Sequence, residues 1–218
     1  MIREVADIGN LQFGFRPGRG TTDAVFILRE LQEKHLEGSK NLYHAFVELE
    51  KAFDRVPREL VYWSLPKKGV PETPQGTSEV GLHQGSSLSP LLSIIVIDVV
   101  SEECGEGLLW ETLFVDDLVI SATSEKNLEA QLRKWKKALQ GRGLKVNMKK
   151  NVVMRSSKGA GINIKEESGA KYDQVDEFKY LGSTMASERG CERAVKDRVK
   201  AKWREVSAVM CDKSYQLS

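Results

Sequence analysis

The alternation of hydrophobic and polar positions predicts several short helices and strands along the chain. Between 125 and 140, Leu128, Leu132, Trp135 and Leu139 recur at spacings of three and four residues. This spacing is typical of an amphipathic helix that buries one face. The segment is the clearest helix prediction in the sequence.

End signals and hydrophobic content predict further helices. Together with the helix above, the expected helices cover residues 21–36, 58–65, 90–104, 125–140 and 191–210. Thr21 or Thr22 is the expected N-cap of the first helix, and Gly38 lies just past its end. Pro66 lacks a backbone N–H and is expected to stop the second helix. The third helix is apolar on most sides, which predicts that it is buried.

Short β-prone runs complete the pattern. They cover residues 42–49, two segments that meet at 116 and 117 between 112 and 122, and the shorter runs 144–148, 151–154, 162–164 and 178–181. Helices and strands occur in mixed order, so the expected fold class is α+β. Glu48 lies at the end of the first predicted strand, and Asp116 and Asp117 lie at the turn between two others.

Composition and charge narrow the function classes only slightly. The 218 residues are 40% hydrophobic and carry a net charge of +2, so overall charge does not indicate a nucleic-acid partner. Basic residues gather locally, at 145–158 and 189–204. Solvated helix faces and turns would explain each of these segments equally well.

Cysteine usage and hydropathy favour an intracellular protein, nuclear or cytoplasmic. Cys104, Cys191 and Cys211 lack the close spacing of a zinc site or a redox pair, which predicts free thiols in a reducing compartment. The longest apolar run, 91–100, is about half of the ~20 residues that span a bilayer. The first residues contain no apolar segment typical of a secretory signal.

The adjacent carboxylates of Asp116 and Asp117 are the first candidate for chemistry. Two neighbouring negative charges repel each other unless cations neutralise them. Hard divalent ions suit carboxylate oxygens, and a pair of such ions can stabilise phosphoryl transfer. Taken alone, however, this pair is more often a solvated acidic turn, and Glu48 and Glu50 could equally be a solvated strand end.

Six segments resemble motifs of a known family and follow one another in the same order. Phe-Val-Glu-Leu-Glu-Lys-Ala-Phe-Asp-Arg-Val-Pro at 46–57 and Leu-Phe-Val-Asp-Asp-Leu-Val-Ile at 113–120 resemble motifs A and C of reverse transcriptases from non-LTR (LINE-like) retrotransposons. Four more segments follow the family's order: 12–24 resembles its fingers loop and helix, 81–90 motif B, 143–150 motif D and 178–183 motif E. The resemblance runs from about Gln12 to Trp203.

The resemblance implies a polymerase palm, which is a ferredoxin-like antiparallel sheet with helices on one face. Residues 1–39 would be partial fingers, 40–183 the palm and 184–218 the start of a thumb helix. The expected activity is RNA-directed DNA synthesis, with an RNA template, a DNA primer and dNTPs as partners and no membrane. The oligomeric state stays open.

The family's metal site maps onto three acidic residues. Glu48, Asp116 and Asp117 would bind two Mg²⁺ ions, with Mn²⁺ as a substitute, and would be catalytic. Lys150 would lie near the leaving pyrophosphate, where a cation assists departure. Most lysines in such a basic stretch are merely solvated.

Five further positions map onto substrate contacts. Phe53 would stack under the deoxyribose and exclude a 2′-OH, although a Phe in an apolar segment usually packs in a core. Gln84 and Gly85 would contact the template and the incoming nucleotide, although a bare Gln-Gly is otherwise just a loop. Arg16 and Arg19 would contact phosphates, or else belong to a solvated turn.

Two departures from the family pattern bear on activity. Glu48 replaces the family's Asp and places its carboxylate one methylene farther out, and about an ångström of misplacement can cost ~10²-fold in rate. About ten residues separate Val70 from Gly81, where the family carries a few tens, so the palm is expected to be internally deleted and the chain truncated. Pro66 and Asn151 also depart from the pattern.

These departures keep two other interpretations open. One is a catalytically inactive retrotransposon remnant that at most binds nucleic acid. The other, far less favoured, is a metal-dependent enzyme of a different family that uses the paired aspartates.

Overall fold

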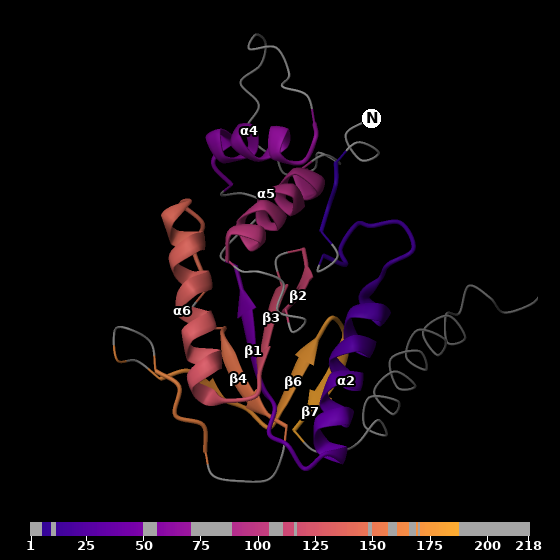
Figure 1. Cartoon of the computed structure of the whole chain (residues 1–218), viewed down its shortest axis with the longest axis vertical. Coiled ribbons are helices and arrows are strands. Elements are labelled where there is room, and N and C mark those ends of the chain that lie inside the picture. The colour runs from indigo at the N-terminus through magenta and orange to yellow at the C-terminus, as the bar shows by residue number, and fades with distance from the viewer. Residues whose placement is uncertain are drawn as a thin grey trace, which may run out of the picture.

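A computed structural model describes residues 6–9, 12–49, 56–70, 89–104, 111–115, 117–147, 150–156, 161–165, 169 and 171–187. Its elements, in chain order, are α2 (Thr21–Glu37), β1 (Tyr43–Glu48), α4 (Arg58–Lys67), α5 (Ser89–Cys104), β2 (Glu111–Phe114), β3 (Asp117–Ala122), α6 (Glu125–Gly141), β4 (Val152–Arg155), β5 (Asp173–Gln174), β6 (Glu177–Tyr180) and β7 (Ser183–Ala186). Figure 1 shows their arrangement.

The central sheet has five strands in the order β2-β3-β1-β4-β5. Antiparallel pairs join β2 to β3, β3 to β1 and β1 to β4, as the palm prediction requires. The short β5 pairs with β4 in parallel, so the sheet is mixed rather than wholly antiparallel. The hairpin of β6 and β7 forms a second sheet of two strands.

Side chains that alternate along β1 divide between the two faces of this sheet. Tyr43, Ala45 and Val47 join a core that α4, α5 and α6 cover. Phe46 points to the other face, where α2 and the hairpin of β6 and β7 pack against it. Figure 1 accordingly shows α6 and α2 on opposite sides of the strands.

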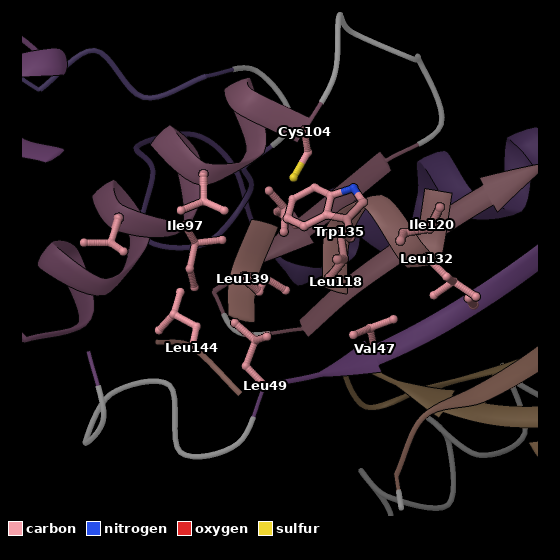
Figure 2. Close-up of a cluster of buried hydrophobic side chains, with 14 of the residues drawn as sticks. Val47, Leu49, Ile97, Cys104, Leu118, Ile120, Leu132, Trp135, Leu139 and Leu144 are labelled. Carbon is pink, nitrogen blue, oxygen red and sulfur yellow. The ribbon is translucent and has the colours of Figure 1, made fainter. Parts of the chain in front are cut away.

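The larger core combines residues of α4, α5 and α6 with residues of the central strands. Figure 2 shows Cys104 of α5, Trp135 of α6 and Leu118 of β3 converging in it. The four hydrophobic residues that predicted α6 are all buried. The apolar helix α5 is also mostly buried, as predicted. The Cys104 thiol is buried.

Two helix ends differ from the prediction. The N-cap of α2 is Gly20 rather than Thr21 or Thr22, and the Asp23 carboxylate accepts a hydrogen bond from the Gly20 N–H at 2.7 Å. Pro66 lies inside α4, which continues to Lys67. Only Lys67 follows the proline in α4, so the helix ends one residue after Pro66 rather than before it.

Two predicted strands are wrong and two short strands went unpredicted. Residues 144–147 form only an isolated bridge between Val146 and Leu49, because β1 has already ended there. Ile164 is buried, but 162–164 is not a strand. The unpredicted strands are β5, which is two polar residues long, and β7, whose Ser-Thr-Met-Ala sequence carries little hydrophobic signal. The predicted helix at 191–210 lies outside the described residues.

Candidate active site

Two carboxylates predicted to share a site lie on neighbouring strands. Glu48, the last residue of β1, is the register partner of Asp117, the first residue of β3. Opposed residues of an antiparallel pair have Cα atoms about 4.5–5.5 Å apart. Alternation along the two strands places Glu48 and Asp117 on the same face as Phe46 and Val119. The fold therefore brings the two predicted ligands together at one end of the sheet.

The backbone of Glu48 is fixed by the segment before β4. Its N–H donates to the Asn151 side-chain Oδ1 at 3.0 Å, and its carbonyl accepts from the Asn147 N–H at 2.9 Å. Asn151 is buried, with 3% of its surface exposed. This anchoring role of Asn151 was not predicted from the sequence, where the residue registered only as a departure from the family pattern.

The Lys150 side chain forms an ion pair with Glu48. Its ammonium Nζ lies 2.5 Å from Glu48 Oε1, and the two side chains are 59% and 35% exposed. The Lys150 N–H donates to the Asn147 carbonyl at 3.1 Å, which forms the turn that presents the side chain. The structure thus brings these two predicted site residues together, with the Lys150 ammonium beside the Glu48 carboxylate.

Tyr180 is a buried polar residue close to this end of the sheet. Its ring centroid lies 5.8 Å from that of Phe46, two residues before Glu48. Burial, and after it the negative charge of Asp117, raises the pKa of the Tyr180 hydroxyl. Among the described residues this hydroxyl has no hydrogen-bond partner. Sequence reasoning placed Tyr180 in motif E without giving it a role.

The loop before α2 carries the two arginines predicted to contact nucleic acid. Arg16 donates from Nη1 to the Gly9 carbonyl at 2.7 Å, and the Arg19 guanidinium lies 5.0 Å from the centre of the Phe13 ring. Both side chains are half-buried. Each therefore helps to hold its own loop.

The remaining predicted site residues lie outside the described part of the chain. They are Asp116, Phe53, Gln84 and Gly85.

The donors at this end of the sheet suit a divalent cation. Carboxylate oxygens are the ligands that hard cations prefer, and Glu48 and Asp117 present them from facing strand ends. Within the described residues, no group of three candidate ligands gathers, and the third predicted carboxylate, Asp116, is not among those residues. A cation at Glu48 would compete with the Lys150 ammonium.

Comparison with known proteins gives a family match over most of the chain. A family described as reverse transcriptase (RNA-dependent DNA polymerase) matches residues 1–185. The chain is 26% identical over 185 residues to a Pol polyprotein from a type-1 retrotransposable element R2 of Nasonia vitripennis, covering 66% of this chain and 18% of the relative. It is 27% identical over 219 residues to the RNA-directed DNA polymerase of the mobile element jockey of Drosophila funebris, covering 80% and 23%. The chain therefore spans about a fifth of the length of these relatives.

Solved structures with a similar fold include telomerases. Candida albicans telomerase in complex with a telomeric RNA fragment gives a TM-score of 0.56 at 12% identity, over 81% of this chain and 34% of that one. Apo telomerase of Candida tropicalis, truncated from its C-terminal domain, gives 0.54 at 15% identity, over 81% and 39%. At these identities the likeness supports the fold, which is a polymerase palm.

Within the described ranges, every helix is too short or too polar to cross a membrane.

Proposed function

The chain belongs to the reverse transcriptase (RNA-dependent DNA polymerase) family, with non-LTR retrotransposon polymerases as relatives, and on that premise we propose that it carries a template-directed DNA polymerase site weakened by Glu48. The observation that carries the proposal is the pairing of Glu48 with Asp117 across β1 and β3. The proposed substrates are an RNA template, a DNA primer and dNTPs. The proposed reaction is attack of the primer 3′-OH on the α-phosphorus of a dNTP, with pyrophosphate leaving.

Three acidic residues would hold two divalent ions, Mg²⁺ by preference and Mn²⁺ as a substitute. They are Glu48, Asp116 and Asp117. Bound ions of this kind supply positive charge for the attacking and leaving oxygens of phosphoryl transfer. The protein's own contribution is to fix the carboxylates, and the contacts of Asn147 and Asn151 with the Glu48 backbone support that role.

Lys150 would serve the leaving group. Its half-exposed ammonium forms an ion pair with Glu48, one of the three proposed metal ligands, which supports this role. An exposed ion pair contributes only about 0–1 kcal/mol, so a phosphate could replace the carboxylate as the partner of Lys150. For Phe53, Gln84 and Gly85 we propose the sugar-stacking and template contacts that the motif matches imply, and for Arg16 and Arg19 contacts with nucleic-acid phosphates.

The proposed organisation is partial fingers at 1–39, a palm at 40–183 and the start of a thumb at 184–218. An internal deletion near 70–80 is part of the proposal. The alignment with the jockey polymerase extends over 219 positions but takes in 80% of the 218 residues, which supports missing segments. We propose a nuclear or cytoplasmic location for the chain, as its cysteine usage suggests.

Primer extension on an RNA template tests the activity. The unsubstituted chain and Glu48→Asp are compared with Mg²⁺ and with Mn²⁺, and Asp117→Asn is the matched inactive control. Shortening the side chain to the family's Asp should raise the rate by about 10- to 100-fold, since misplacement of about an ångström has a cost of this size.

A second candidate function is nucleic-acid binding by an inactive remnant. Two observations favour this second function. Glu48 replaces the family's Asp, and the Glu48 carboxylate forms an ion pair with the Lys150 ammonium. A folded Glu48→Asp variant that extends no primer with either ion, yet binds an RNA–DNA hybrid, would establish this alternative and refute the polymerase proposal.

A further inference from the structure

Two backbone N–H groups from distant segments converge on one buried side-chain oxygen. Gln12 Oε1 accepts a hydrogen bond from the Gly14 N–H at 2.9 Å and another from the Val115 N–H at 3.1 Å. Gln12 is fully buried. The side chain therefore ties the loop before α2 to the turn between β2 and β3.

Val115 has an unusual backbone conformation at this turn. Its φ is 62°, in the left-handed region that β-branched residues rarely adopt. Such a conformation costs on the order of 1–3 kcal/mol and persists only where the surroundings hold it. Val115 directly precedes Asp116 and Asp117 in the sequence, and β3 begins at Asp117.

The loop lies against this turn at very short range. The Phe13 N–H donates to the Leu113 carbonyl at 2.9 Å, which aligns the loop with β2. A Cβ at Gly14 would lie 2.5 Å from Val115 Cγ2 and 3.0 Å from the Val115 nitrogen. Only glycine allows this approach. Gln12 and Gly14 thus act together, one as acceptor and the other by its missing side chain.

We propose that Gln12 is a positioning residue for the active site, which acts by holding Val115 in its left-handed conformation and so aiming the acidic pair. The expected effect on catalysis rests on the proposed polymerase function. The effect on the Val115 conformation can be measured even in a chain that has no activity.

The test replaces Gln12 with methionine, which has a similar length but no oxygen acceptor. The matched control is Gln32→Met, which removes another buried glutamine hydrogen bond, from Gln32 Nε2 to the Ala186 carbonyl. Both variants are made in the unsubstituted chain and in Glu48→Asp. The readouts are thermal unfolding, primer-extension kcat and KM, and the NMR signals of Val115.

In Gln12→Met, the Val115 amide resonance should shift and the strong contact between its amide and Cα protons, a mark of positive φ, should weaken. In the active background, kcat should fall about tenfold or more while KM for primer and template stays near its reference value. Gln32→Met should lower thermal stability to a similar extent without either effect. Adding Val115→Gly to Gln12→Met should recover part of kcat, because glycine adopts positive φ without strain.

An unchanged Val115 signal in Gln12→Met would overturn the inference, and so would an unchanged kcat in an active background. If no variant extends a primer, the polymerase proposal fails and the Val115 signals alone decide the positioning role. If Gln12→Met does not fold, hydrogen exchange in the unsubstituted chain decides it. The Val115 amide should then exchange about as slowly as that of Val119 in β3, and fast exchange would refute the hydrogen bond to Gln12.

Discussion

Asn151 links the chemistry of the site to the stability of the sheet at the scale of one residue. Its buried Oδ1 is the acceptor for the Glu48 N–H. Asn151→Ala would leave that N–H without this partner, so the free energy of unfolding should fall by about 1–3 kcal/mol. Asn41→Ala is the control, since it removes an exposed side chain that accepts from Arg155, and its cost should stay within about 0.5 kcal/mol. Equal losses in urea unfolding would contradict the role given to Asn151.

His44 makes stability depend on pH. Burial, and after it the charge of nearby His35, lowers the pKa of His44 to about 4. Its Nδ1 lies 2.8 Å from Ser121 Oγ. In the unfolded chain His44 has its ordinary pKa of about 6.5, so the unfolded chain binds a proton at a higher pH than the folded chain does. Above pH ~6.5 His44 is neutral in both states, and the free energy of unfolding is not reduced by its protonation. As the pH falls from 6.5 toward 4, protonation of the unfolded chain lowers the free energy of unfolding by roughly 3 kcal/mol.

The measurement is urea unfolding of the unsubstituted chain and of His44→Asn at pH 7 and pH 5. The unsubstituted chain should lose more stability between these values than His44→Asn, in which this group no longer titrates. His35→Gln should keep most of the pH dependence. Parallel pH profiles for the unsubstituted chain and His44→Asn would count against a neutral, buried His44.

At the scale of helices and strands, a buried ion pair joins α4 to α5. Lys68, which follows α4, places Nζ 2.5 Å from Asp98 Oδ2, and the side chains are 3% and 1% exposed. Asp98 also accepts from the Gly9 N–H at 2.8 Å. Burial by itself would lower the pKa of Lys68, but hydrogen bonds and charge from Asp98 and Glu102 outweigh it and raise that pKa.

Lys68→Met should therefore destabilise the fold strongly, because it leaves the Asp98 carboxylate buried without its cation. The expected loss is about 3 kcal/mol. Lys67→Met is a matched control at the neighbouring position, since Lys67 pairs with Glu103 where both side chains are substantially exposed, and its cost should be below about 1 kcal/mol. Similar midpoints for the two variants in urea unfolding would refute the distinction.

Elements with a strong hydrophobic pattern of their own could be predicted from the sequence, and those defined by their partners could not. The helix α6 follows from hydrophobic spacing, and the strand β1 follows from a continuous β-prone apolar run. The strand β5 exists because β4 offers an edge, and β7 exists because β6 folds back onto it. Likewise Glu48 and Lys150 followed from motif matches, whereas the roles of Gln12 and Asn151 depend on contacts between residues more than 100 positions apart.

At the scale of the whole molecule, the central sheet separates two hydrophobic clusters, a larger one on one face and a smaller one on the other. One face carries the large core beneath α4, α5 and α6, and the other carries Glu48 and Asp117 beside the contacts of α2 and the β6–β7 hairpin. The ends of β1 and β3 thus present the acidic residues at the edge of the smaller core. In the proposed polymerase, primer and template would approach this end of the sheet.

A net charge of +2 means that binding of an RNA–DNA hybrid would depend on a few local cations. Each phosphate contact contributes about one unit to the slope of log affinity against log salt concentration. If Arg19 makes such a contact, Arg19→Ala should reduce that slope by about one unit and weaken binding similarly for different sequences. Lys67→Ala, a charge change on α4 away from the site, should leave the slope unchanged. Equal slopes for Arg19→Ala and the unsubstituted chain would mean that Arg19 serves only to stack on Phe13 within its own loop.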